Sequence, residues 1–121
     1  MADNDQRLDE LTRTWQAPPG FLGWLKVVNQ TNIGVRYIVT SFLFFRAAGV
    51  LGVVIRLQLA VPENDLIGPG LYNQIFSVHG ITMMFLFAIP MVEGMGVYLV
   101  PLMVGTRDLS FPRLSAFSYF V

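Results

Sequence analysis

The one histidine in this 121-residue sequence, His79, is the residue most able to do chemistry. A neutral imidazole among apolar residues can ligate haem iron or copper, relay protons, or make an interhelical hydrogen bond. The chain offers only weak further ligands, such as Met83 and Met84, so we do not expect it to close a metal site alone. It has no cysteine, which excludes a thiolate metal site, a disulfide scaffold and a cysteine nucleophile.

Arg56 is the next candidate, because Ala48 and Gly52 precede it at steps of four residues on one face of a helix. Small residues mark a face where helices approach closely, so the guanidinium should project toward protein. There it needs an acceptor, which a carboxylate, a backbone carbonyl or a cofactor oxygen could provide. Snorkelling of the side chain to the lipid headgroups is the alternative.

Two carboxylates complete the set of candidates. Glu93 lies on nearly the same helical face as His79, about 20 Å along the helix axis, and could shuttle protons or pair with Arg46. We favour the ion pair. Asp108 lies in a polar segment between two arginines. It is either a loop carboxylate whose ion pair adds little stability, or a proton-collecting group at a water-filled opening, and the sequence leaves both readings open.

The elements that must hold these residues are apolar. Apolar residues make up 54% of the sequence and charged residues 13%, with eight Lys and Arg against eight Asp and Glu. This is the composition of a membrane protein, and the even charge balance indicates no nucleic-acid partner. We therefore predict an all-α transmembrane helix bundle, of which the chain holds the first two helices and the start of a third. The predicted segments are a tail with an interfacial part at 1–34, transmembrane helices at 35–60 and 74–104, an outer loop at 61–73, an inner loop at 105–113, and a truncated third helix at 114–121.

Local signals refine these boundaries. Asn29, Asn32 and Gly34 predict a turn before the first span, Pro90 predicts a kink in the second, and Pro101 should end its regular part. Lys and Arg occur in the tail and the inner loop but not in the outer loop, so the positive-inside rule places the amino terminus on the cytoplasmic side. The last apolar run is too short to span a bilayer. We expect a piece of a longer protein, and the alternative is that this run packs against partner subunits.

These segments together resemble subunit I of the haem–copper terminal oxidases, the cytochrome c and quinol oxidases, over residues 33 to 121. The order and spacing of the matching stretches make the resemblance specific. They are Ser77–Gly80 with Met83–Pro90, Tyr98–Gly105 with Arg107–Asp108 and Phe111–Leu114, and Ile55–Leu59.

The resemblance implies roles for three residues. His79 matches the histidine that is an axial ligand of the low-spin haem, expected to be haem a, with its second ring nitrogen bonded to a nearby acceptor. Arg56 matches the arginine that hydrogen-bonds a substituent of that haem. Asp108 matches the carboxylate at the mouth of an inner proton-uptake pathway. Val97 and Ser115 stand where family members with this pathway often have asparagine.

The implied function is that of a respiratory oxidase catalytic subunit, which reduces O2 to water with electrons from cytochrome c and translocates protons. The high-spin haem and copper B would be held outside this sequence, and the 121 residues alone should be inactive. The implied partners are subunits II and III, cytochrome c or quinol, and the lipid bilayer of a bacterial plasma membrane. The alternatives are a quinol oxidase of the same superfamily, and a non-catalytic small membrane subunit in which His79 and Arg56 only make interhelical hydrogen bonds.

Overall fold

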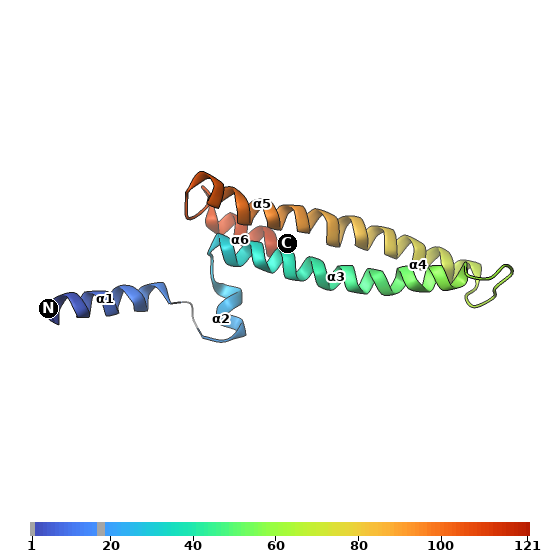
Figure 1. Ribbon diagram of the computed structural model, residues 1–121, viewed down its shortest axis with the longest axis horizontal. Coiled ribbons are helices and arrows are strands. Elements are labelled where there is room, and N and C mark those ends of the chain that lie inside the picture. The colour runs from blue at the N-terminus through green and yellow to red at the C-terminus, as the bar shows by residue number, and fades with distance from the viewer. Residues whose placement is uncertain (1, 17–18) are drawn as a thin grey trace.

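Every element in the part of the chain that the structure describes is a helix. The computed structural model describes residues 2–16 and 19–121, so Met1 and residues 17 and 18 of the predicted tail lie outside the description. The helices are α1 (Ala2–Trp15), α2 (Phe21–Lys26), α3 (Gln30–Gln58), α4 (Pro69–Ile81), a π-helical segment η1 (Thr82–Ala88), α5 (Ile89–Val104) and α6 (Pro112–Phe120) (Figure 1). The predicted all-α class is confirmed.

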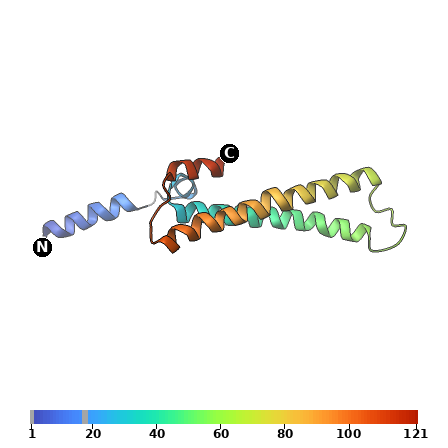
Figure 2. The same ribbon diagram turned by 90° about the horizontal axis from the view of Figure 1, so that it is seen from above.

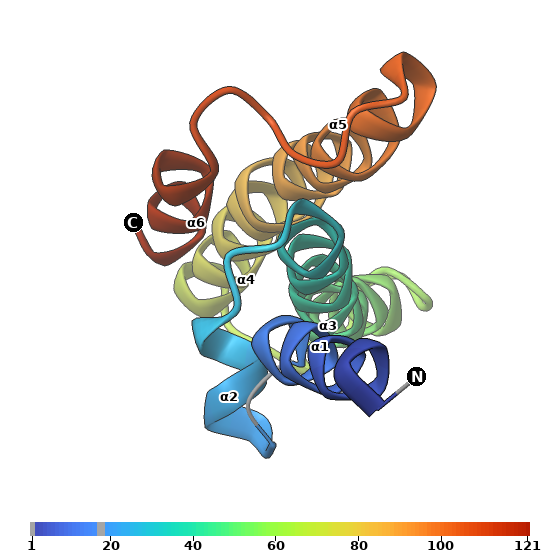
Figure 3. The same cartoon turned by 90° about the vertical axis from the view of Figure 1, so that its left-hand side faces the viewer.

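Two long helical runs form an antiparallel hairpin. One is α3, with 29 residues, and the other is the 36-residue run of α4, η1 and α5 from Pro69 to Val104. Both are long and apolar enough to cross a membrane. The loop after α3 closes one end of the hairpin, and the amino-terminal segments and α6 lie at the other (Figures 1 and 2). Viewed from its amino-terminal end, the hairpin has α6 beside it (Figure 3).

Both long runs begin five residues earlier than expected. The turn predicted over Asn29 to Gly34 is wrong beyond its first residue, because α3 begins at Gln30 and contains Gly34. The Asn29 side chain accepts a hydrogen bond of 3.1 Å from the Thr31 N–H, which makes it the N-cap. The second run begins at Pro69, whose missing N–H and fixed φ suit the first turn of a helix.

The sequence predicts that Pro90 kinks the second long run and that Pro101 ends its regular helix. Pro101 does not end the regular helix, because α5 continues to Val104. The helix ends instead at Gly105, whose φ of 76° lets the Thr106 N–H bond the Pro101 carbonyl at 2.9 Å. Pro90 follows η1, where the Ile89 N–H reaches back five residues to the Met84 carbonyl. The wide π turn therefore lies where the kink was predicted.

The hairpin is tightest where α3 crosses α5, at two glycines. A Cβ on Gly34 would lie 2.9 Å from the Tyr98 Cβ and 3.0 Å from the Gly94 carbonyl oxygen. A Cβ on Gly94 would lie 2.7 Å from the Tyr37 Cβ and 3.1 Å from the Gly34 carbonyl oxygen. Both positions therefore need glycine for the backbones to approach, as small residues allow in membrane helices.

We expect Gly94→Ala to lower the free energy of unfolding by about 1–3 kcal/mol, because the added methyl group overlaps Tyr37 and the helices must separate. The measurement is the thermal unfolding of the purified full-length subunit in detergent. Gly96→Ala is the matched control, since nothing lies within 4 Å of a Cβ built there. Equal unfolding temperatures for the two variants would contradict this close crossing.

Candidate functional site

The His79 ring on α4 is oriented by the backbone of α3. Its Nδ1 lies 2.9 Å from the carbonyl oxygen of Ala48. A carbonyl oxygen can only accept, so Nδ1 carries the proton and donates it, and Nε2 keeps a free lone pair. The acceptor that the sequence could not name is thus a main-chain oxygen of the neighbouring helix. This arrangement is the one that holds a metal-binding imidazole in a single tautomer.

Gly52 gives the His79 ring its place against α3. A Cβ on Gly52 would lie 3.2 Å from the His79 Cε1 and 3.6 Å from Nδ1. Ala48, one turn earlier, is completely buried. The small-residue face predicted from the spacing of these two residues is therefore the face on which the imidazole packs.

Arg56 occupies the next position on the same face of α3, about 6 Å beyond Gly52 along the helix axis. Its side chain is exposed. Within residues 2–16 and 19–121 its guanidinium has neither an ion-pair nor a hydrogen-bond partner. The Arg56 guanidinium and the His79 Nε2 lone pair therefore lie at the same end of the hairpin. The described residues contain no cluster of three His, Cys, Asp or Glu side chains that could hold a metal ion.

Asp108 lies at the opposite end of the hairpin, in the turn between α5 and α6. It is exposed, and its Oδ1 accepts a long hydrogen bond of 3.5 Å from the backbone N–H of Gln30. Gln30 is the first residue of α3, so the carboxylate lies at the positive end of a long helix dipole. His79 and Arg56 therefore share one end of the hairpin, whereas Asp108 lies at the other.

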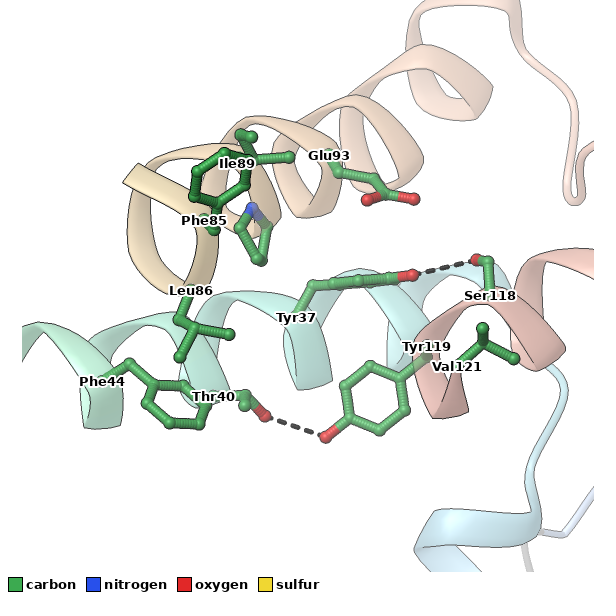
Figure 4. Close-up of a pocket in the computed structure, with 11 residues that line it drawn as sticks. Tyr37, Thr40, Phe44, Phe85, Leu86, Ile89, Glu93, Ser118, Tyr119 and Val121 are labelled. Atoms are coloured by element: carbon green, nitrogen blue, oxygen red, sulfur yellow. Dashed lines mark hydrogen bonds between the residues drawn. The ribbon is translucent and has the colours of Figure 1, made fainter. Parts of the chain in front are cut away.

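The predicted ion pair between Glu93 and Arg46 is wrong, because no salt bridge joins them in the described chain. Arg46 is exposed on α3. It lies two residues from Ala48, which places it about 200° around the helix from the face that packs against α4. Glu93 lines a cavity of about 340 Å³ with residues of α3, η1 and α6 (Figure 4).

Sequence reasoning missed the polar residues that join α3 to other segments. The Tyr37 and Ser118 hydroxyls are 2.9 Å apart, and those of Thr40 and Tyr119 are 2.8 Å apart. Arg36 is completely buried, donates from Nη2 to the Trp24 and Val27 carbonyls, and lies 5.0 Å from the Trp24 ring centroid. No periodicity in the sequence marks Arg36 for these contacts, so only the tertiary arrangement identifies it.

Two apolar helices long enough to span a bilayer, with an oriented imidazole between them, define an integral membrane protein of the all-α class. Residues 32–121 match the family described as cytochrome c and quinol oxidase polypeptide I. The chain belongs to this family, which confirms the resemblance found in the sequence.

Relatives from three organisms agree. The chain is 44% identical over 94 residues to cytochrome c oxidase subunit 1 of Synechocystis sp., covering 78% of this chain and 17% of that protein. It is 41% identical over 106 residues to heme-copper oxidase subunit I+III of Aeropyrum pernix, covering 84% of this chain and 13% of the relative. It is 37% identical over 106 residues to cytochrome c oxidase polypeptide 1 of Halobacterium salinarum, covering 88% and 18%. The chain therefore spans less than a fifth of the length of these relatives.

Proposed function

We propose that this chain is part of the catalytic subunit of a respiratory haem–copper oxidase, which oxidises cytochrome c, reduces O2 to water and translocates protons. Family membership and the names of the relatives support the oxidase. The structural observation that carries the proposal is the free Nε2 of His79, held in place by the bond from Nδ1 to the Ala48 carbonyl.

The residues present fit a low-spin haem, which we propose to be haem a. His79 offers one nitrogen lone pair, Gly52 leaves room for its ring, and Arg56 offers a guanidinium on the same face that has no partner among the described residues. In this proposal His79 ligates the iron and Arg56 donates hydrogen bonds to a polar substituent of the macrocycle. When bound, a haem with imidazole ligation supplies an electron-transfer centre. The chain's own contribution is orientation, since α3 fixes both the tautomer and the angle of the imidazole.

Asp108 is the proposed site of proton uptake. Its carboxylate is exposed at one end of the hairpin and lies at the amino terminus of α3. An accessible carboxylate can take a proton from water at one oxygen and release it inward, which is the task of a collecting group. In this proposal the end that carries Asp108 and the amino terminus faces the cytoplasmic side of a bacterial plasma membrane, and the distribution of Lys and Arg supports this orientation.

The remaining parts of the enzyme are proposed to come from outside this chain. They are the high-spin haem, copper B, and subunits II and III, with cytochrome c as the electron donor. The proposal is supported by the short extent of the chain relative to its relatives and by the single histidine it contains. A binuclear haem–copper centre needs several nitrogen ligands, which this sequence does not hold.

Oxygen consumption by membranes that contain the full-length subunit tests the proposal. We expect reduced cytochrome c to support oxygen consumption, and membranes without the subunit to show none. Consumption with quinol alone would replace the proposal by a quinol oxidase of the same superfamily. Inactivity with both donors, in membranes where the subunit is present, would favour a non-catalytic membrane subunit.

A further inference from the structure

The cavity beside Glu93 has a polar side within an otherwise apolar part of the hairpin. It is lined by α3, η1, the first turns of α5, and α6, and its volume of about 340 Å³ leaves room for several water molecules. Figure 4 shows the Glu93 carboxylate directed toward the Tyr37 and Ser118 hydroxyls, which are 2.9 Å apart. The Thr40 and Tyr119 hydroxyls lie in the same cavity, 2.8 Å apart.

None of the described residues that line the cavity carries a positive charge to balance this carboxylate. The titratable groups that line the cavity are Glu93 from α5, Tyr37 from α3 and Tyr119 from α6, and the described lining contains no lysine, arginine or histidine. The expected partner Arg46 lies on a different face of α3 and is exposed. A carboxylate within an apolar span and without a cation is costly, whereas the neutral acid needs only hydrogen bonds. The hydroxyl pair can supply these bonds, because each hydroxyl both donates and accepts.

The local backbone beside the cavity lacks one hydrogen-bond donor. Pro90 lines the cavity and has no N–H, so one carbonyl of the preceding turn lacks its helical donor. The π register of η1, in which the Ile89 N–H bonds the Met84 carbonyl, widens this same turn. A cavity with five polar side chains, beside a helix turn that lacks one backbone donor, is a place that water can occupy.

We propose that Glu93 is a proton-holding residue, a neutral carboxylic acid at rest that exchanges its proton with water in this cavity. In the exchange, the carboxyl O–H bond breaks and the proton passes to a water molecule. The carboxylate then takes a proton from another water that has itself received one from the uptake side, so each water returns to neutral and no oxidant or reductant is required. Glu93 lies about 16 Å along α5 from the end of the helix that precedes Asp108. The inference rests on the proposed function, in which Asp108 collects protons at that end.

Infrared difference spectroscopy of the assembled full-length oxidase, oxidised against reduced, tests this inference. We expect a carboxylic C=O stretching band that is absent in Glu93→Gln and shifted in Tyr37→Phe, which removes the neighbouring hydroxyl. Turnover of Glu93→Gln should fall by about tenfold or more, because positioned proton-transfer groups contribute about 100- to 10,000-fold to rates. The haem spectrum should be unchanged. Glu63→Gln, in the loop after α3, is the matched control and should keep both the band and the rate.

A band that persists in Glu93→Gln, or no band in the parent enzyme, would overturn the inference. Should Glu93→Gln fail to assemble, the band of Tyr37→Phe decides: a shift supports the inference and an unshifted band opposes it. Asp108→Asn, measured in parallel, separates the two proposals. Normal turnover in Asp108→Asn, together with an intact Glu93 band, would reject only the proposed proton uptake at Asp108. Slow turnover in Asp108→Asn, together with no Glu93 band in the parent enzyme, would reject only the proposed role of Glu93.

Discussion

The visible absorbance of the low-spin haem should disappear from the full-length oxidase when His79 is replaced by alanine, and turnover should disappear with it. Alanine removes the Nε2 lone pair, and the rest of the proposed coordination cannot be supplied by this chain because it has no second histidine. The loss should be confined to one haem, since the high-spin centre is proposed to take its ligands from elsewhere. Optical spectra and haem extraction from the purified enzyme measure both effects.

A milder variant of the neighbouring helix guards against simple misfolding in His79→Ala. Gly52→Ala would place a methyl group 3.2 Å from the His79 Cε1, so the ring must move by a few tenths of an ångström while remaining present. We expect the haem to be retained with a shifted absorbance maximum. Gly49→Ala should change nothing, because no atom lies within 4 Å of a Cβ there. An unaltered visible spectrum in His79→Ala would mean that this imidazole makes only an interhelical hydrogen bond and is not a haem ligand.

The hairpin could be predicted from the sequence because its two apolar runs are much longer than any competing pattern. The residues at which the two helical runs begin could not be predicted, because local helix propensity and packing disagree there. Asn32 and Gly34 are poor helix formers, yet they lie within α3, where the absence of a side chain at Gly34 lets α5 approach its backbone. Pro101 is similar, since losing one N–H is tolerated when the helix can be closed four residues later by Gly105.

The candidate site could likewise be predicted only in part from the sequence. The spacing of Ala48 and Gly52 predicted the face on which His79 packs, because steps of four residues are a property of one helix alone. The pairing of Tyr37 with Ser118 joins residues 81 positions apart, and no periodicity within a helix contains that information. The predicted pair of Arg46 and Glu93 failed for a related reason. Opposite charges at matching depth indicate a pair only when both side chains face the same interface.

Asp108→Asn should slow proton uptake and oxygen reduction by about tenfold or more while leaving the haem content unchanged, in line with the 100- to 10,000-fold that positioned proton-transfer groups contribute. Asparagine keeps the shape of the side chain, and its Oδ1 can still accept from the Gln30 N–H. The asparagine amide, unlike the carboxylate, cannot take up and release a proton. The loop structure is therefore preserved and only the proton chemistry is removed. Stopped-flow proton uptake and steady-state oxygen consumption, with optical haem quantification, measure the three quantities.

The control for Asp108→Asn is Asp65→Asn, which removes a carboxylate from the loop at the opposite end of the hairpin. We expect it to leave proton uptake from the Asp108 side unaffected, because in the proposed function protons are drawn only from the compartment that the Asp108 end of the hairpin faces. Normal turnover in Asp108→Asn would mean that protons enter by another route. Val97 and Ser115 make this outcome informative, since neither side chain carries the amide that the resemblance led us to expect at these two positions. In that case Glu93 and its hydroxyl partners become the next group to test, because they line a cavity between the same helices.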